Sequence, residues 1–309
     1  MPEFVLTVFE KILILFLMIA AGYVCGKRNI VSEDGAKEMS SVLFYVVTPG
    51  VIISSLQSAV GEVSLMNLAV SGALSAVSFG IFIGVSFLLY RGEEPERRNL
   101  LRFASVYSNC GFIGLPLVQG LIGAKGVVYA SVYIAVYNLF VWTHGLTVMG
   151  GKSGGSRWKK LVFNPGVIGL IVGFFLFAFS IRLPEVLLKP LNYFSDVNTP
   201  LAMIVIGFYI ARVPFRSMFE DRCLYRLSFY RLLLLPAICF AVLLLFHADR
   251  TVFLSMLILN AAPAGANAVM FAAQFGGDTK LASRAVALTT LFSLLTLPVF
   301  PVLANLLYR

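Results

Sequence analysis

Charged residues are separated by long apolar runs along this chain. Seven stretches free of Asp, Glu, Lys and Arg are each long enough for a helix to cross the bilayer core, which takes about 20 residues. Three further apolar stretches hold one or two charges each: Glu10 and Lys11, Asp196, and Arg226 and Arg231. The pattern predicts ten spanning helices, at about 4–25, 38–60, 64–90, 99–122, 126–149, 164–182, 190–211, 226–247, 251–275 and 284–307.

The composition excludes a water-soluble globule. Of the 309 residues, 59% are hydrophobic and 13% charged, whereas soluble domains carry about 25% charged residues. The net charge of +9 does not indicate nucleic acid, because most Lys and Arg lie in the loops after spans 1, 3, 5, 7 and 9 or at the adjoining span ends. Basic residues in short loops stay cytoplasmic. This places a multi-pass protein in the cell inner membrane with both termini on the outer side, in contact with lipid.

An internal repeat predicts how the ten helices are arranged. A shift of 151 residues superimposes uncommon residues of two halves, and five spans per half is an odd number. The halves must then enter the membrane from opposite sides, as inverted repeats do. We expect an all-α protein with repeats at 1–149 and 164–309, joined by a basic cytoplasmic linker at 150–163. The superimposed residues are Thr48-Pro49 with Thr199-Pro200, Asn109 with Asn260, and Gly114 with Gly265.

Spans 4 and 9 contain residues that interrupt helices. Proline removes a helical hydrogen bond, glycine loosens the backbone, and each freed peptide group needs a partner inside a membrane. Paired interruptions in corresponding spans indicate a transporter's binding site. We therefore expect spans 4 and 9 to be broken and to cross near the bilayer midplane. The interrupting residues are Gly111, Gly114 and Pro116 in span 4, and Pro263 and Gly265 in span 9.

Broken helices of this kind suit an organic anion. The N-terminus of a half-helix offers unpaired N–H groups and a positive dipole end, and asparagine amides both donate and accept hydrogen bonds. The alternative is structural, since glycine and proline are common in membrane helices and asparagine also joins helices together. The predicted substrate-binding residues are Asn109, Cys110, Gly111, Pro116, Asn260, Ala261, Pro263 and Asn267.

Two ionisable residues are candidates for ion coupling, Asp196 before Pro200 in span 7 and His144 late in span 5. An interfacial Asp and a hydrogen-bonded structural His are the alternatives. No nucleotide-binding, hydrolase or metal-binding motif occurs in the sequence. We expect neither an enzyme nor a cofactor or metal.

Three stretches of the chain resemble the auxin efflux carrier family in its compact bacterial form, whose fold is related to that of the bile acid/sodium symporters. They are SSVLFYVVTPGVIISSL, SNCGFIGLPLVQGLIGAKGVVYASVY and AAPAGANAVMFAAQFGGDTKLASRAVALTTLFSLLTLP. Asn109 and Pro116 match the family's first crossover motif, and Pro263 the start of the second. Plant members place another proline where this chain has Asn267-Ala268, which departs from the family pattern.

The resemblance implies a secondary transporter for a small organic anion, such as a dicarboxylate, monocarboxylate or auxin-like acid. It also implies an elevator mechanism, in which spans 3–5 and 8–10 move against a scaffold of spans 1, 2, 6 and 7, and a homodimer formed through that scaffold. We expect efflux by uniport or exchange. A sodium- or proton-coupled symporter and a receptor or channel-like acid binder remain the alternatives.

Overall fold

The computed structural model describes residues 2–58, 60, 63–150 and 165–307; the predicted linker at 150–163 lies outside this range except for Gly150. The described residues form helices and one isolated β-bridge. The α-helices are α1 Pro2–Lys27, α2 Glu33–Val42, α3 Thr48–Ser58, α4 Leu65–Leu88, α5 Pro95–Val106, α6 Leu115–Ile122, α7 Ala124–Phe140, α8 Leu146–Val148, α10 Pro165–Ala178, α11 Glu185–Ala211, α12 Arg222–Phe229, α13 Leu235–Leu245, α14 Arg250–Ala261, α15 Asn267–Phe275, α16 Thr279–Thr296 and α17 Val299–Leu307.

Short irregular helical turns link several of these helices into longer rods. The π-turns are η1 Leu43–Val47, η2 Cys110–Gly114, η3 Val141–Gly145 and η5 Tyr230–Leu234, and η4 Arg216–Met218 is a 3₁₀ turn. π-Turns are rare and gather at functional sites. Two of them, η2 and η5, belong to the candidate site described below.

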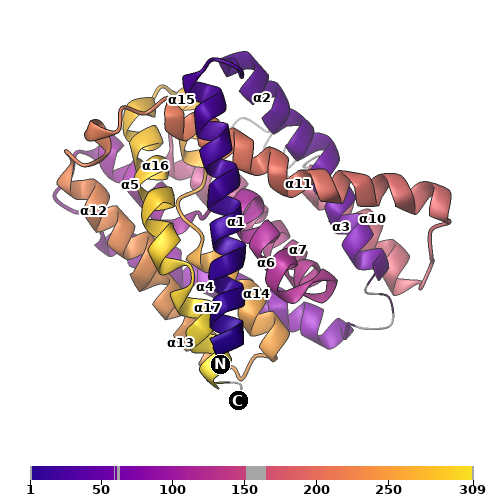
Figure 1. Ribbon diagram of the computed structural model, residues 1–309. Coiled ribbons are helices and arrows are strands. Elements are labelled where there is room, and N and C mark those ends of the chain that lie inside the picture. The colour runs from indigo at the N-terminus through magenta and orange to yellow at the C-terminus, as the bar shows by residue number, and fades with distance from the viewer. Residues whose placement is uncertain (1, 59, 61–62, 151–164, 308–309) are drawn as a thin grey trace.

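Seven helical segments among the described residues are long and apolar enough to cross a membrane. Three shorter apolar helices, Cys110–Ile122, Pro165–Ala178 and Arg250–Ala261, lie in the predicted spans 4, 6 and 9. The chain is therefore an all-helical, multi-pass membrane protein. Both ends of the described chain lie at the same end of the molecule (Figure 1), as an even number of crossings requires. The ten-span inverted repeat stays a prediction.

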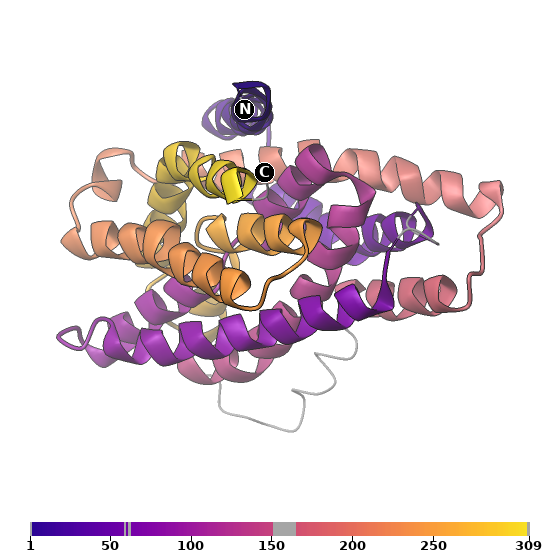
Figure 2. The ribbon, with the colours of Figure 1, turned by 90° about the horizontal axis from the view of Figure 1, so that it is seen from below.

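Glycines bring two pairs of helices into close contact. Helix α1 lies at one edge of the molecule (Figure 2) and packs along α11, where Gly22 and Gly207 face backbone atoms of the opposite helix. Helix α10 packs along α3 in the same way, through Gly169 and Gly173. Small residues at such crossings let membrane helices approach closely and gain dispersion energy.

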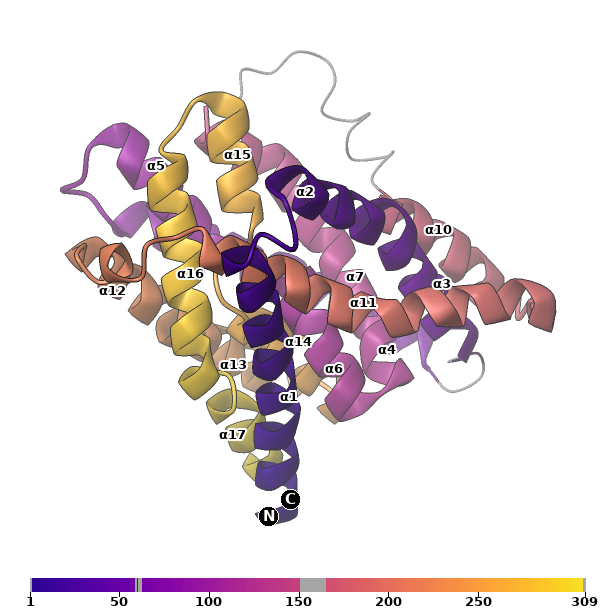
Figure 3. The same cartoon turned by 45° about the horizontal axis from the view of Figure 1, so that its top comes forward.

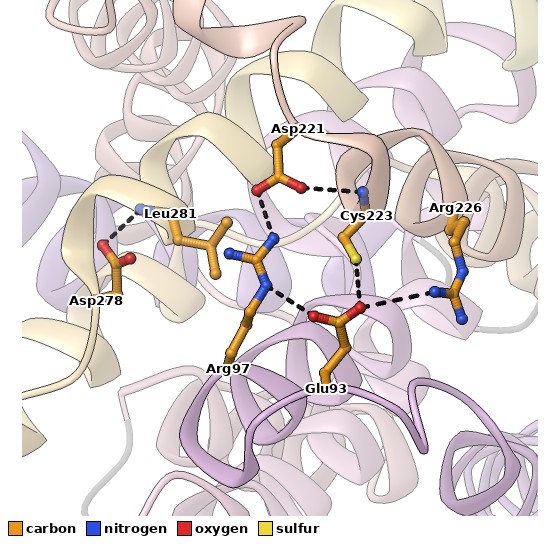
Figure 4. A network of polar contacts seen from close by, with 7 residues as sticks. All are labelled: Glu93, Arg97, Asp221, Cys223, Arg226, Asp278 and Leu281. Atoms are coloured by element: carbon orange, nitrogen blue, oxygen red, sulfur yellow. Dashed lines mark hydrogen bonds and ion pairs between the residues drawn. The ribbon is translucent and has the colours of Figure 1, made fainter.

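A polar network joins the start of α5 to the start of α12 (Figure 4). The Arg97 guanidinium binds Glu93 at 3.0 Å and Asp221 at 2.5 Å, and Arg226 lies 3.7 Å from Glu93. Asp221 also caps α12 by accepting a hydrogen bond from the backbone N–H of Cys223. The short ion pairs that join the two helices are those of Arg97, and Arg226 adds only a longer contact to Glu93.

Candidate functional site

Two interruptions of the helical backbone lie next to each other inside the protein. The first, at residues 107–109, separates α5 from η2 and α6. The second, at residues 262–266, separates α14 from α15. Helices α5 and α15 lie on one side of the interruptions, and α6 and α14 on the other (Figure 3).

The two interruptions satisfy each other's backbone groups. The N–H of Asn109 donates to the carbonyl of Pro263 at 2.7 Å, and the N–H of Gly265 donates to the carbonyl of Tyr107 at 2.9 Å. These bonds make the isolated antiparallel bridge between Ser108 and Ala264. Backbone outside a helix survives at membrane depth only when protein or cavity water satisfies it. The pairing explains how both breaks persist together.

Helices α7 and α16 hold the second interruption in place. From α7, the Tyr133 hydroxyl donates to Asn260 Oδ1 at 3.1 Å, and the Tyr137 hydroxyl accepts from Asn267 Nδ2 at 3.2 Å. From α16, Thr289 Oγ1 accepts from the N–H of Ala264 at 3.2 Å. The break is thus fixed by side chains of two neighbouring helices.

Four helix ends meet at this crossing: two C-termini and two N-termini. Helices α5 and α14 arrive with their C-termini and present carbonyl oxygens, whereas η2 and α15 begin there and present N–H groups. A helix terminus carries roughly half an elementary charge, negative at the C-terminus and positive at the N-terminus. The crossing therefore has a side suited to a cation and a side suited to an anion.

Asn109 and Asn260 differ sharply in how their amides are used. Asn109 is 5% exposed, stands directly before η2, and its Nδ2 has no hydrogen-bond partner among the described residues. Asn260 is fully buried in the last turn of α14, where its Nδ2 donates to Cys239 Sγ and to the Met256 carbonyl. The Asn109 amide therefore has an unused donor among the described residues, whereas the Asn260 amide donates to the protein.

The other predicted residues gather around the same crossing. Cys110 opens η2, Ala261 ends α14, Pro263 lies in the second interruption and Asn267 opens α15. A Cβ placed on Gly111 would meet no atom within 4 Å, so open space adjoins η2 at this point. The structure brings all of these residues together around the two interruptions.

Pro116 lies in the first turn of α6, several residues beyond the interruption. Because η2 runs directly into α6, Pro116 lies inside this helical rod and not at the break at 107–109. It lines a pocket of about 190 Å³ between α1, α6 and α11, together with Lys11, Gln119 and Thr199. Lys11 is a cationic side chain at the wall of this pocket.

The two predicted coupling residues lie in different surroundings. Asp196 is exposed on α11, whereas Ser195 and Asn198, a turn apart on one face, are buried. His144 in η3 contacts a side chain of the first interruption, since its Nδ1 lies 3.0 Å from the hydroxyl of Tyr107. Among the described residues, no three His, Cys, Asp or Glu side chains come together as a metal site requires.

Sequence reasoning missed two polar side chains at this site. In the sequence Arg231 stands as a charge near the start of span 8, but in the structure it is fully buried and binds backbone carbonyls at the crossing. Asn198 is 1% exposed, and its Nδ2 also has no partner among the described residues. Its neighbour Ser195, one turn away, accepts from Gln119 of α6 at 3.4 Å, so Asn198 shares the face of α11 that meets α6 and η2. The available signal was a strongly polar residue within an apolar run.

Comparison with known proteins gives one consistent family. A family model described as membrane transport protein matches residues 7–157 and 151–301, which together span nearly the whole chain. An uncharacterized transporter of Methanocaldococcus jannaschii is 24% identical over 302 residues, covering 93% of this chain and 96% of its own. One from Methanothermobacter thermautotrophicus is 26% identical over 304 residues, covering 95% and 97%. A probable auxin efflux carrier component from Oryza sativa is 26% identical over 153 residues, covering 48% of this chain and 26% of its own.

Proposed function

The chain belongs to the membrane transport protein family, that of the auxin efflux carriers, and on this premise we propose that it is a secondary carrier for a small organic anion. Its relatives are transporters rather than enzymes. The proposed substrates are small mono- or dicarboxylates and auxin-like acids. The proposed mode is efflux by uniport or exchange, with alternating access of the elevator type.

The observation that carries this proposal is the free donor capacity on one side of the crossing. The N-termini of η2 and α15 each contribute roughly half a positive charge, which together match one carboxylate. Asn109 Nδ2 adds a buried donor without a partner among the described residues. An amide donating to a carboxylate makes a charge-assisted bond, about twice as strong as one between neutral groups. Asn109, Cys110, Gly111 and Asn267 would contact the acid, while Asn260, Ala261 and Pro263 would shape the site.

Two contacts related by the 151-residue shift support the inverted repeat. A Cβ on Gly22 would lie 2.6 Å from the Cα of Ile204, and a Cβ on Gly173 would lie 3.3 Å from the Cα of Ile53. The shift converts the first pair into the second. Residues that lie on the two-fold axis between two repeats must contact their own equivalents. Ser108 and its equivalent Leu259, 151 residues away, are in such contact, because Ser108 Oγ donates to the carbonyl of Leu259 at 2.8 Å. We therefore keep ten spans in repeats 1–149 and 164–309 as part of the proposal.

The proposed scaffold consists of spans 1, 2, 6 and 7, that is α1, α2 with α3, α10 and α11. These helices pack on one another through the glycine contacts described above. Exposed apolar side chains on α10 and α11, among them Phe174, Phe175 and Tyr193, offer a face for lipid or for the second protomer of the proposed homodimer. The distribution of basic residues supports an inner-membrane location with both termini outside.

The test of this function is counterflow in liposomes. Purified protein is reconstituted into vesicles loaded with unlabelled malate, malonate, lactate or an indole acid, and uptake of the same labelled acid is followed with and without sodium and a pH gradient. Saturable counterflow of one acid establishes a carrier, sodium or proton dependence selects the symporter, and a conductance that does not saturate selects a channel. Folded protein that exchanges none of these acids contradicts the proposal.

Lys11 at the wall of the pocket gives a prediction about affinity. We expect Lys11→Gln to raise the KM for the acid about threefold to tenfold at low ionic strength, with an unchanged maximal rate, because a cation at the wall of this pocket raises the local anion concentration. Lys189→Gln, which removes an exposed lysine of α11, is the matched control. Equal KM values for the two variants would exclude this role for Lys11.

The variant His144→Gln tests whether His144 couples transport to protons. The Tyr107 hydroxyl donates its single hydrogen to the carbonyl of Phe140 at 2.9 Å, so His144 Nδ1–H donates to the hydroxyl oxygen. We expect His144→Gln, whose amide also donates, to keep the exchange rate within about threefold of wild type and leave its pH dependence between about 6 and 8 unchanged. A pH profile that flattens in this variant would instead make His144 the coupling group.

A further inference from the structure

Arg231 is a fully buried arginine in the middle of the membrane domain. It lies in η5, the π-turn between α12 and α13, and its exposed fraction is 0%. An arginine within a membrane helix is costly and rarely retained without a function. None of the ion pairs among the described residues includes it. Something other than a carboxylate must balance its charge.

The guanidinium binds the carbonyl oxygens at the C-termini of both half-helices. Arg231 Nη1 donates to the carbonyl of Ser105 at 2.7 Å and to that of Val106 at 3.0 Å, at the end of α5. Its Nη2 donates to the carbonyl of Asn260, in the last turn of α14. One side chain therefore joins the two helices whose C-termini meet at the crossing.

The charges at this point balance. Each helix C-terminus carries roughly half a negative charge, so two of them offset the single positive charge of one guanidinium. Convergent carbonyl oxygens are also the ligands that hard metal cations prefer in proteins. The same oxygens would form a cation site if the guanidinium were removed.

We propose that Arg231 is a built-in cation that occupies the cation side of the crossing, so that this carrier needs no sodium ion to hold its broken helices together. This inference rests on the proposed transport function. Arg231 is a positioning residue: it holds the ends of α5 and α14, and through them the N-termini that bind the anion. Removing it creates a dependence on an added cation that the wild-type protein lacks.

The test compares wild type, Arg231→Ala and Arg231→Met with Arg231→Lys, which retains the charge. Arg226→Ala is the matched control, because Arg226 lies in the same span but pairs with Glu93 in the network of Figure 4. Counterflow is measured in choline medium, in sodium medium and with millimolar guanidinium chloride. We expect wild type and Arg226→Ala each to exchange the acid at the same rate in all three media. Arg231→Ala should lose about 100-fold in choline, since it leaves buried carbonyls without a partner, and recover substantially with guanidinium.

Three results would overturn the inference: a sodium requirement in wild type, wild-type exchange by Arg231→Ala in choline, or equal rates for Arg231→Met and Arg231→Lys. The melting temperature in detergent provides a second readout that does not need transport. Guanidinium should raise it in Arg231→Ala and leave it unchanged in wild type and Arg226→Ala. If wild type exchanges no acid but this rescue occurs, the proposed substrate class fails and the role of Arg231 stands. If wild type exchanges an acid and neither readout shows rescue, the role of Arg231 fails alone.

Discussion

Replacing Asn109 by Ala is expected to abolish nearly all exchange at acid concentrations near the wild-type KM, while leaving the protein folded. The Asn109 amide makes no side-chain hydrogen bond through Nδ2 among the described residues, so its loss breaks no internal contact of that donor. A hydrogen bond to a charged group is worth about 1.5–3 kcal/mol, which corresponds to roughly a 10- to 100-fold loss of affinity. Counterflow over a range of acid concentrations, with melting temperature as the measure of folding, checks this.

Asn99→Ala is the matched control, because Asn99 lies in α5 and belongs to the same predicted span. We expect it to exchange the acid at the wild-type rate. Asn109→Asp should be at least as damaging as Asn109→Ala, since a second carboxylate would repel the substrate. An Asn109→Ala variant that transports with wild-type KM and rate would remove Asn109 from the site.

Replacing Gly265 by Ala is expected to disrupt the crossing itself. A Cβ at this position would lie 2.9 Å from the Ser108 carbonyl oxygen and 3.2 Å from that of Tyr107, both fixed backbone atoms. The two interruptions would have to separate, weakening the bond from the Gly265 N–H to Tyr107. Overpacking of this kind costs about 1–3 kcal/mol. The variant should melt at a lower temperature and lose exchange.

Gly84→Ala is the control for this substitution. A Cβ on Gly84 of α4 would meet no atom within 4 Å, and alanine is a better helix former than glycine. It should melt at or above the wild-type temperature and transport normally. Wild-type melting and exchange by Gly265→Ala would show that the close contact between the interruptions is dispensable.

The helical membrane fold followed from the sequence because it depends on one strong signal, the spacing of charges. Apolar runs of about 20 residues between charged residues predict spanning helices by a simple length requirement. The signal does not fix helix ends: α10 ends at Ala178, before the end of the predicted span 164–182. Helix ends are set by caps and packing, which the hydropathy pattern does not contain.

The sequence pattern predicted interruptions within 99–122 and 251–275, where the structure has them, but it did not locate the first one. Pro263 and Gly265 lie in the second interruption, whereas the first lies at 107–109, before Gly111 and well before Pro116. Its position depends on bonds from Asn109 and to Tyr107, made with a segment about 155 residues away. A local pattern identifies residues that tolerate a break, and tertiary contacts decide where the backbone leaves the helix.

The role of Arg231 could not be deduced from its own neighbourhood. In the sequence it stands near the start of an apolar run, as an interfacial arginine also does. Only the arrangement of α5 and α14 around it shows that its guanidinium lies between two helix C-termini. Charge balance at the crossing depends on four helix ends together, and the sequence around any one of them does not reveal it.

Equilibrium binding of the labelled acid to purified protein tests the central claim most directly. Arg231 binds the carbonyl side of the crossing, and on the N–H side Asn109 Nδ2 has no partner among the described residues; we propose that one anion binds there. We predict saturable binding of one acid per chain by wild type and Asn99→Ala, and a loss of at least about tenfold in affinity for Asn109→Ala. Equal affinity of wild type and Asn109→Ala for the acid that the protein transports would contradict an anion site at the interruptions.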